Sequence, residues 1–235
     1  MDRKKVSERH LLTKFISSPG LDLKVTSITD SEAPDFIIET VDKKISIELT
    51  GLINPDLRQV EAYRDKIIKQ AESKFREKYN EDLYTLVTFE NVDLNSGKNE
   101  EAKYADKLFT AIETLFLANK DFEFDITLKD DKRINEFISR LHINNRLGFN
   151  NWQHFGAYLV DFVKMEWLTE RIIEKEKNLK KYKDNFDENW LLLSSNFGTK
   201  SSASRFDFLD FKEIKTDFDK IFVYKYMPNE TITIK

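Results

Sequence analysis

The chain of 235 residues contains no cysteine. Disulfides, thiolate catalysis, thiolate zinc sites and iron–sulfur clusters are therefore excluded. Glycine and proline are also scarce, with six and four residues, which argues against a disordered or low-complexity chain. No stretch approaches the roughly 18 apolar residues of a membrane span, and the charged N-terminal residues lack the apolar core of a signal peptide. These absences predict a folded cytoplasmic protein without a membrane partner.

Motifs for histidine-bound metals and for nucleotides are absent as well. The three histidines are scattered at His10, His142 and His154, and no HExxH spacing occurs. No GxGxxG or GxxxxGK[ST] loop is present, which argues against a phosphate cradle of either type. The net charge is −4, with both signs interleaved. Any nucleic-acid binding would therefore need a local basic surface.

Hydrophobic spacing predicts helices and strands that alternate along the chain. Helices are expected over 6–17, 54–79, 100–119, 131–141 and 166–183. Strands are expected over 21–29, 35–40, 44–52, 83–92, 122–128, 190–195, 218–226 and 230–235, and within the aromatic stretch 142–165. This order predicts an α/β fold in which helices pack on a sheet. We expect a single domain, 1–235, made of a core over 6–92, an extension over 95–165 and C-terminal helix and strands over 166–235.

Two helix–strand segments resemble each other. Residues 65–89 and residues 170–195 each consist of a charged helix that leads into an apolar strand. A recurring helix–strand unit explains this likeness as well as a duplication does. In the second segment the basic residues of 171–183 are interleaved with glutamates, which predicts a solvated helix.

The segment with the clearest chemical potential lies between residues 34 and 52. Asp35 opens one predicted strand, and Glu48 lies inside the next, among apolar neighbours. A carboxylate inside such a strand is costly unless it is paired, protonated or bound to a cation. A hairpin would bring both carboxylates to one ion, and carboxylates with waters suit Mg²⁺. The alternatives are that Asp35 caps a turn and that Glu48 faces solvent at an edge or pairs with a lysine.

These residues also carry a resemblance to a family. Pro34-Asp35, followed after twelve residues by Glu48-Leu49-Thr50, resembles the signature of the PD-(D/E)XK nuclease superfamily. The resemblance implies a restriction-endonuclease-like core, a mixed β-sheet flanked by helices, with an α+β C-terminal extension. It also implies that Asp35 and Glu48 bind Mg²⁺ or Mn²⁺ and that nucleic acid, DNA more than RNA, is the substrate.

The resemblance has one departure and suggests three groups of further residues. Thr50 stands where the family has a lysine that positions or activates the attacking water. Lys66, on the following helix, is the expected replacement. Gln59 and Tyr63 resemble the Gln-x-x-x-Tyr element of RecB-like exonucleases and would line the site. Glu8, on the first helix, matches an extra metal-binding glutamate of several members, and its alternative is a favourable acid in a first helical turn.

The resemblance leads to two functional hypotheses, and a third possibility is a purely structural or interaction protein in which the match of Asp35 and Glu48 is accidental. The first is a metal-dependent nuclease that hydrolyses phosphodiester bonds by means of a metal-activated water. The second is a catalytically silent nuclease-like domain that binds nucleic acid or protein, which Thr50 and the acidic net charge favour. A lysine within hydrogen-bonding reach of the site of the attacking water would distinguish the first from the second.

Overall fold

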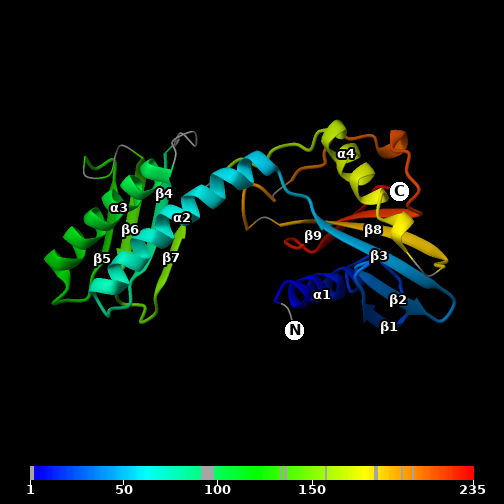
Figure 1. The fold of residues 1–235 in the computed structure, drawn as a ribbon, viewed down its shortest axis with the longest axis horizontal. Helices are drawn as coiled ribbons and strands as arrows, with labels where there is room; N and C mark the ends of the chain where they lie inside the picture. The colour runs from blue at the N-terminus through cyan, green and yellow to red at the C-terminus, as the bar shows by residue number, and fades with distance from the viewer. Residues whose placement is uncertain are drawn as a thin grey trace. The chain divides into compact units, whose positions relative to one another are not determined.

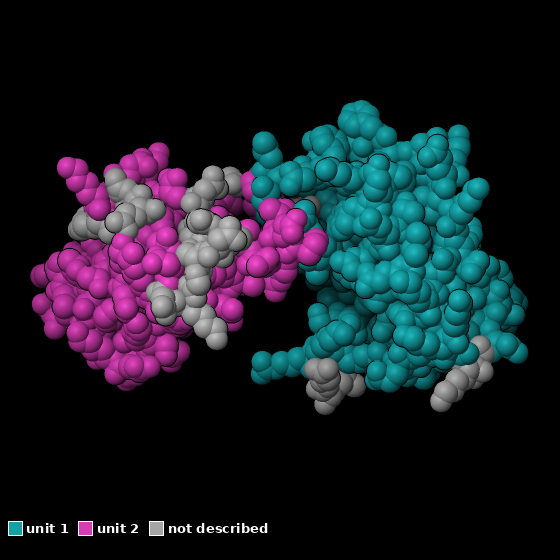
Figure 2. Space-filling view, turned by 45° about the horizontal axis from the view of Figure 1, so that its top comes forward, with its two compact units in different colours: residues 1–54, 159–235 teal, residues 55–158 magenta. Residues whose placement is uncertain are grey.

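A computed structural model describes residues 3–90, 98–132, 134, 137–156, 158–182, 185–196, 198–202 and 204–235, without the side chains of residues 98 and 99. The chain forms two compact units, coloured separately in Figure 2. The first unit contains residues 1–54 and 159–235, and the second contains residues 55–158. The second unit is therefore a continuous segment between the two parts of the first.

The first unit is built on a mixed sheet of six strands in the order β1-β2-β3-β8-β9-β10. The strands are β1 (Val25–Asp30), β2 (Phe36–Thr40), β3 (Lys44–Gly51), β8 (Glu188–Ser195), β9 (Lys220–Lys225) and β10 (Glu230–Thr233). β1, β2 and β3 are antiparallel neighbours, whereas β8 pairs in parallel with both β3 and β9. The short helices η1 (Leu179–Lys181) and η2 (Phe211–Glu213) belong to the same unit.

Helices cover both faces of this sheet, as Figure 1 shows for α1 (Arg3–Ile16) and α4 (Met165–Glu176). The apolar side of α1 contributes Leu12 and Phe15 to a core that contains Ile47 of β3. On the other face, α4 contributes Leu168 to a core that contains Leu191 of β8. Both faces are buried, and β8 accordingly has a continuous apolar run, WLLL. β3 is also mostly buried, but its apolar residues alternate with the polar residues Ser46, Glu48 and Thr50.

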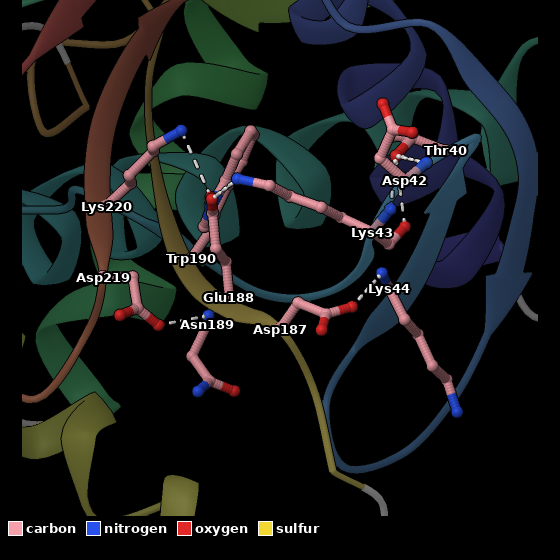
Figure 3. A network of polar contacts seen from close by, with 10 residues as sticks. All are labelled: Thr40, Asp42, Lys43, Lys44, Asp187, Glu188, Asn189, Trp190, Asp219 and Lys220. Atoms are coloured by element: carbon pink, nitrogen blue, oxygen red, sulfur yellow. Dashed lines mark hydrogen bonds and ion pairs between the residues drawn. The ribbon is translucent and has the colours of Figure 1, made fainter.

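A network of polar contacts at the start of β8 joins the N-terminal ends of the parallel strands (Figure 3). The carboxylate of Glu188 forms ion pairs with Lys43 and Lys220 and accepts a hydrogen bond from Trp190 Nε1. Burial raises the pKa of Glu188, but these donors outweigh it and lower the pKa to about 2. The network therefore stabilises the sheet with a carboxylate that is charged at neutral pH.

The second unit contains a four-stranded mixed sheet in the order β5-β6-β4-β7 and two long helices. Its strands are β4 (Tyr84–Phe89), β5 (Asp125–Lys129), β6 (Ile138–Asn144) and β7 (Asn151–His154), and its helices are α2 (Pro55–Lys78) and α3 (Lys98–Asn119). α2 and α3 pack against each other and against one face of the sheet, where Phe75, Ile112 and Val87 share one core.

The mixed α/β class is confirmed, and most expected elements are present. The helix expected over 131–141 is wrong in its second half, because β6 begins at Ile138. Part of 131–137 and the last two residues of the strand expected over 83–92 lie outside the described residues. Ile134, Ile138 and Leu141 have helical spacing, which suggested the helix. Pairing of β6 with both β4 and β5 overrides that local pattern.

The core expected over 6–92 is divided between the two units. The expected strand over 83–92 is β4, which lies in the second sheet, whereas β8 is the parallel neighbour of β3. The burial of the two strands explains the difference. β4 alternates buried with half-buried residues, as suits a sheet covered on one face, whereas most of β8 is buried on both faces.

Candidate active site

Glu48 lies near the middle of β3, between β2 and β8. Its side chain points to the face covered by α4, because Ile47 and Leu49 on either side of it point into the core beneath α1. Glu48 is only 4% exposed. A buried carboxylate needs charge pairing and hydrogen bonds to offset its desolvation, so the groups around Glu48 determine what it can do.

Three donors from the C-terminal end of α4 and the turn after it surround the Glu48 carboxylate. Lys175 Nζ and Asn178 Nδ2 lie 3.1 and 2.7 Å from Oε1. Tyr182 donates its hydroxyl proton to Oε2 over 3.2 Å. Lys175 is itself mostly buried, with 22% of its side chain exposed. Both carboxylate oxygens therefore have partners, and a cation is held against one of them.

Burial and two nearby carboxylates raise the pKa of the Tyr182 hydroxyl. Desolvation is the largest cause, followed by the negative charge of Glu48, and Asp35 adds a smaller contribution. Because the phenol stays neutral, Tyr182 can act as a permanent donor to Glu48. Tyr182 therefore holds one oxygen of the Glu48 carboxylate in place.

Asp35 immediately precedes β2 and is tied to the Glu48 strand. Its Oδ2 accepts a hydrogen bond of 2.8 Å from the backbone N–H of Leu49. Burial raises the pKa of Asp35; the Leu49 hydrogen bond opposes this shift, the charge of Glu48 adds to it, and the charge of Lys175 opposes it. Asp35, Glu48 and Lys175 therefore form one electrostatically coupled group in the first unit.

Glu8 lies on α1, near the turn that carries Asp35. Lys5, one turn earlier in α1, donates hydrogen bonds to the backbone oxygens of Ser31 and Asp35, at 2.8 and 3.0 Å. The charge of Glu8 contributes to the raised pKa of Asp35, while its carboxylate also pairs with Lys4 at 3.4 Å. The structure thus brings Glu8 within electrostatic range of Asp35.

Within the part of the chain that is described, no three histidine or acidic side chains are grouped closely enough to hold a metal ion. Glu8, Asp35 and Glu48 therefore do not form a ready three-ligand set. The excess of negative charge at Asp35 nevertheless fits a cation, because a bound cation would relieve the repulsion from Glu48 and Glu8 that raises the pKa of Asp35. The metal ligands thus stay a prediction that the charges support.

The other expected site residues are Thr50, which is uncharged, and three residues of the second unit. Thr50 follows Glu48 on the same face of β3 and pairs in register with Leu193 of β8. Gln59, Tyr63 and Lys66 lie on α2, in the second unit, and Gln59 and Lys66 are exposed. Their proposed contribution to the carboxylate site stays a prediction.

The sequence argument missed Lys175, Asn178 and Tyr182. The basic residues of 171–183 were expected to lie on a solvated helix. This prediction is wrong for Lys175, because Lys175 contacts the buried Glu48. The spacing held a partial signal: residues 175, 178 and 182 are three and four apart, which would place them along one stripe of a continuous helix, although α4 itself ends at Glu176. Recognising the stripe required knowing that this helix, rather than α2, covers the Glu48 face.

No family model, curated protein or solved structure matches this chain. The site therefore has to be interpreted from its own residues. Separately, no helix among the described residues combines the length and the apolar character that crossing a membrane requires.

Proposed function

We propose that the first unit is the catalytic part of a metal-dependent nuclease of the PD-(D/E)XK type. The order of elements in this unit supports the proposal: α1, the three antiparallel strands β1–β3, then α4 and the parallel strand β8. This is the helix, strand, hairpin, helix and strand order that the resemblance implies, with residues 55–158 inserted after the hairpin. Asp35 immediately precedes β2, and Glu48 lies on the neighbouring strand β3.

The observation that carries the proposal is the contact of 3.1 Å between Lys175 Nζ and Glu48 Oε1. Thr50 cannot supply a positive charge, and Lys175 supplies one beside the same carboxylate. Its ammonium group has three donors, so it can bind Glu48 and still donate to a water or a phosphate oxygen. Lys175 thereby provides the function that the variant motif lacks at Thr50.

Asp35 and Glu48, assisted by Glu8, are the residues that would hold Mg²⁺ or Mn²⁺. A bound ion of this kind polarises a phosphate and lowers the pKa of a water. The Lys175 ammonium would orient the attacking water and stabilise negative charge that develops on the phosphate. Asn178 and Tyr182 would keep the Glu48 carboxylate oriented. The products of phosphodiester hydrolysis are a phosphate monoester and a hydroxyl group.

A second candidate function is a nuclease-like domain that binds nucleic acid or protein without cleaving. One observation favours it: both oxygens of Glu48 accept hydrogen bonds from side chains of the protein. If these bonds persist in the presence of metal, they compete with coordination by the carboxylate. The two candidates predict opposite outcomes in the same cleavage assay.

Cleavage of labelled single-stranded and duplex DNA and RNA, with Mg²⁺, with Mn²⁺ and with chelator, tests the proposal. We expect wild-type cleavage to require metal and to fall by at least about 100-fold in Glu48→Gln and in Lys175→Ala, because each loses part of the charge stabilisation. Lys177→Ala is the matched control, since Lys177 is exposed on the same stretch of chain. No metal-dependent cleavage by folded wild type on any substrate would contradict the proposal and favour the silent domain.

A further inference from the structure

The sheet of the second unit has one face that α2 and α3 leave uncovered. In β4, Thr85, Val87 and Phe89 are buried, and Val87 and Phe89 pack in the core beneath the helices. Tyr84 and Leu86 alternate with them and are only partly buried. Because side chains alternate across a strand, Tyr84 and Leu86 belong to the opposite face.

The register of the sheet extends this uncovered face over the neighbouring strands. Its members are connected by pairing in register between β4, β6 and β5. We call this set the open face, and it consists of Tyr84, Leu86, Thr88, Asp125, Thr127, Lys129, Arg140, His142 and Asn144. Phe149, in the turn between β6 and β7, lies beside Tyr84 and is counted with it. The open face therefore crosses three strands of one sheet.

Aromatic rings form a row on the open face. The ring of Tyr84 lies edge-on to His142, with 6.2 Å between centroids, and edge-on to Phe149 at 5.8 Å. Phe149 is 49% exposed. Its exposed ring is accessible to a ligand, so this row differs from a sheet surface of simple polar residues.

The open face is positively charged although the chain is acidic. Lys129 and Arg140 are opposite each other in register, and both are exposed. Neither forms an ion pair within the described part of the chain, and the exposed Arg146 follows β6. Asp125 is the only acid on this face among the described residues, and it accepts a hydrogen bond of 2.7 Å from Asn144. The face thus combines unneutralised cations with aromatic rings.

We propose that the open face binds single-stranded nucleic acid. Aromatic side chains stack on unpaired bases, and nearby basic groups attract the phosphates, which is how sheet surfaces of other folds bind single strands. A duplex cannot stack on this face, because its bases are stacked within the helix and offer no free ring to Tyr84 or Phe149. The row of rings and the charge of Lys129 and Arg140 thus specify one class of ligand.

This inference rests on the proposed function, because it treats the single strand bound by the second unit as the substrate that the first unit cleaves. The two can be separated experimentally. In a Glu48→Gln background the full chain should not cleave, so binding to the open face can be measured alone. Loss of cleavage with retained binding would then be a property of the first unit.

The test is fluorescence anisotropy of labelled 20-nucleotide DNA and RNA, single-stranded and duplex, titrated with full-length Glu48→Gln protein. We expect single strands to bind at least about ten-fold more tightly than duplexes. Tyr84→Leu combined with Phe149→Ala should weaken single-strand binding about ten-fold or more, because stacking is lost. Arg140→Gln should weaken it and reduce its salt dependence.

Matched controls lie on the helical side of the same unit. Lys69→Gln on α2 and Leu117→Ala on α3 change an exposed cation and an exposed apolar residue there, and should leave affinity within two-fold. Circular dichroism verifies that each variant is folded. The inference is overturned if the parent binds no single strand, if duplexes bind as tightly, or if the open-face variants bind as well as the controls. If the wild-type protein cleaves nucleic acid but the open-face variants bind single strands as tightly as their parent, this inference is overturned and the proposed function stands.

Discussion

The two sheets of this protein differ in how they are covered. The sheet of the first unit has α1 and α4 on opposite faces, whereas the sheet of the second has α2 and α3 on the same face. A doubly covered sheet can hold a carboxylate such as Glu48 out of water, where its charge acts strongly on nearby groups. A singly covered sheet can instead present an aromatic and basic surface. Helix placement thus gives one unit a buried reactive group and the other a binding face.

The largest expected effects test whether the two units have separate cores. Leu192→Ala in β8 and Phe75→Ala in α2 each remove a fully buried side chain and should destabilise their own unit by about 2–5 kcal/mol. Hydrogen exchange measured by mass spectrometry should show faster exchange mainly in 1–54 and 159–235 for the first variant and mainly in 55–158 for the second. Equal acceleration in both units by either variant would contradict the comparison.

A smaller loss of stability is expected when Glu48 loses its charged partner. Lys175→Ala leaves the buried carboxylate with Asn178 and Tyr182 as its donors. The free energy of unfolding should fall by about 2–3 kcal/mol, less than for a carboxylate left with no partner. Urea unfolding measures the difference, with Lys177→Ala expected within about 0.5 kcal/mol of wild type. A Lys175→Ala protein as stable as wild type would mean that the pair contributes nothing to folding.

Acid should reveal the contribution of Glu188. Its pKa in the folded protein is about 2, below its ordinary value of 4.5, so its stabilisation is present above the ordinary pKa and is lost as pH falls toward 2. Glu188→Gln should therefore lose about 1 kcal/mol less stability than wild type over this range, a figure reduced for solvent screening. Parallel acid unfolding curves for the two proteins would contradict the assigned pKa.

The smallest expected effect on stability belongs to the open face. Phe149 is about half exposed, so Phe149→Ala should change the free energy of unfolding by about 0.5 kcal/mol or less. Thermal unfolding measures this, with Leu117→Ala as the control. A loss above about 2 kcal/mol would indicate that Phe149 is mainly a packing residue, and that reduced ligand binding by this variant reflects damage to the sheet.

The sequence predicted much of the local structure because local patterns determine it. The Asn54-Pro55 start of α2 and the 34–52 hairpin follow from capping and strand spacing. Which helix packs on the hairpin does not follow from such patterns. The segments 65–89 and 170–195 are alike as sequences, and only long-range pairing of β8 with β3 and β9 separates their places in the fold.

The candidate site likewise combines features that local sequence predicts with contacts that it does not predict. Glu48 could be singled out because a carboxylate inside an apolar strand needs a partner. Its partners, Lys175, Asn178 and Tyr182, are more than 120 residues away in the chain, so no local pattern links them to it. Lys66 was chosen because α2 is the next helix in sequence, but Lys175 belongs to the helix that covers the Glu48 face.

Relocating the lysine tests the central claim most directly. Thr50 and Glu48 point to the same face of β3, so Thr50→Lys in a Lys175→Ala background would place an ammonium group at the usual motif position. Metal-dependent cleavage should be lost in Lys175→Ala and partly restored in the double variant, while Lys177→Ala alone retains activity. Undiminished cleavage by Lys175→Ala would contradict the account, because Lys175 would then not serve the Glu48 site.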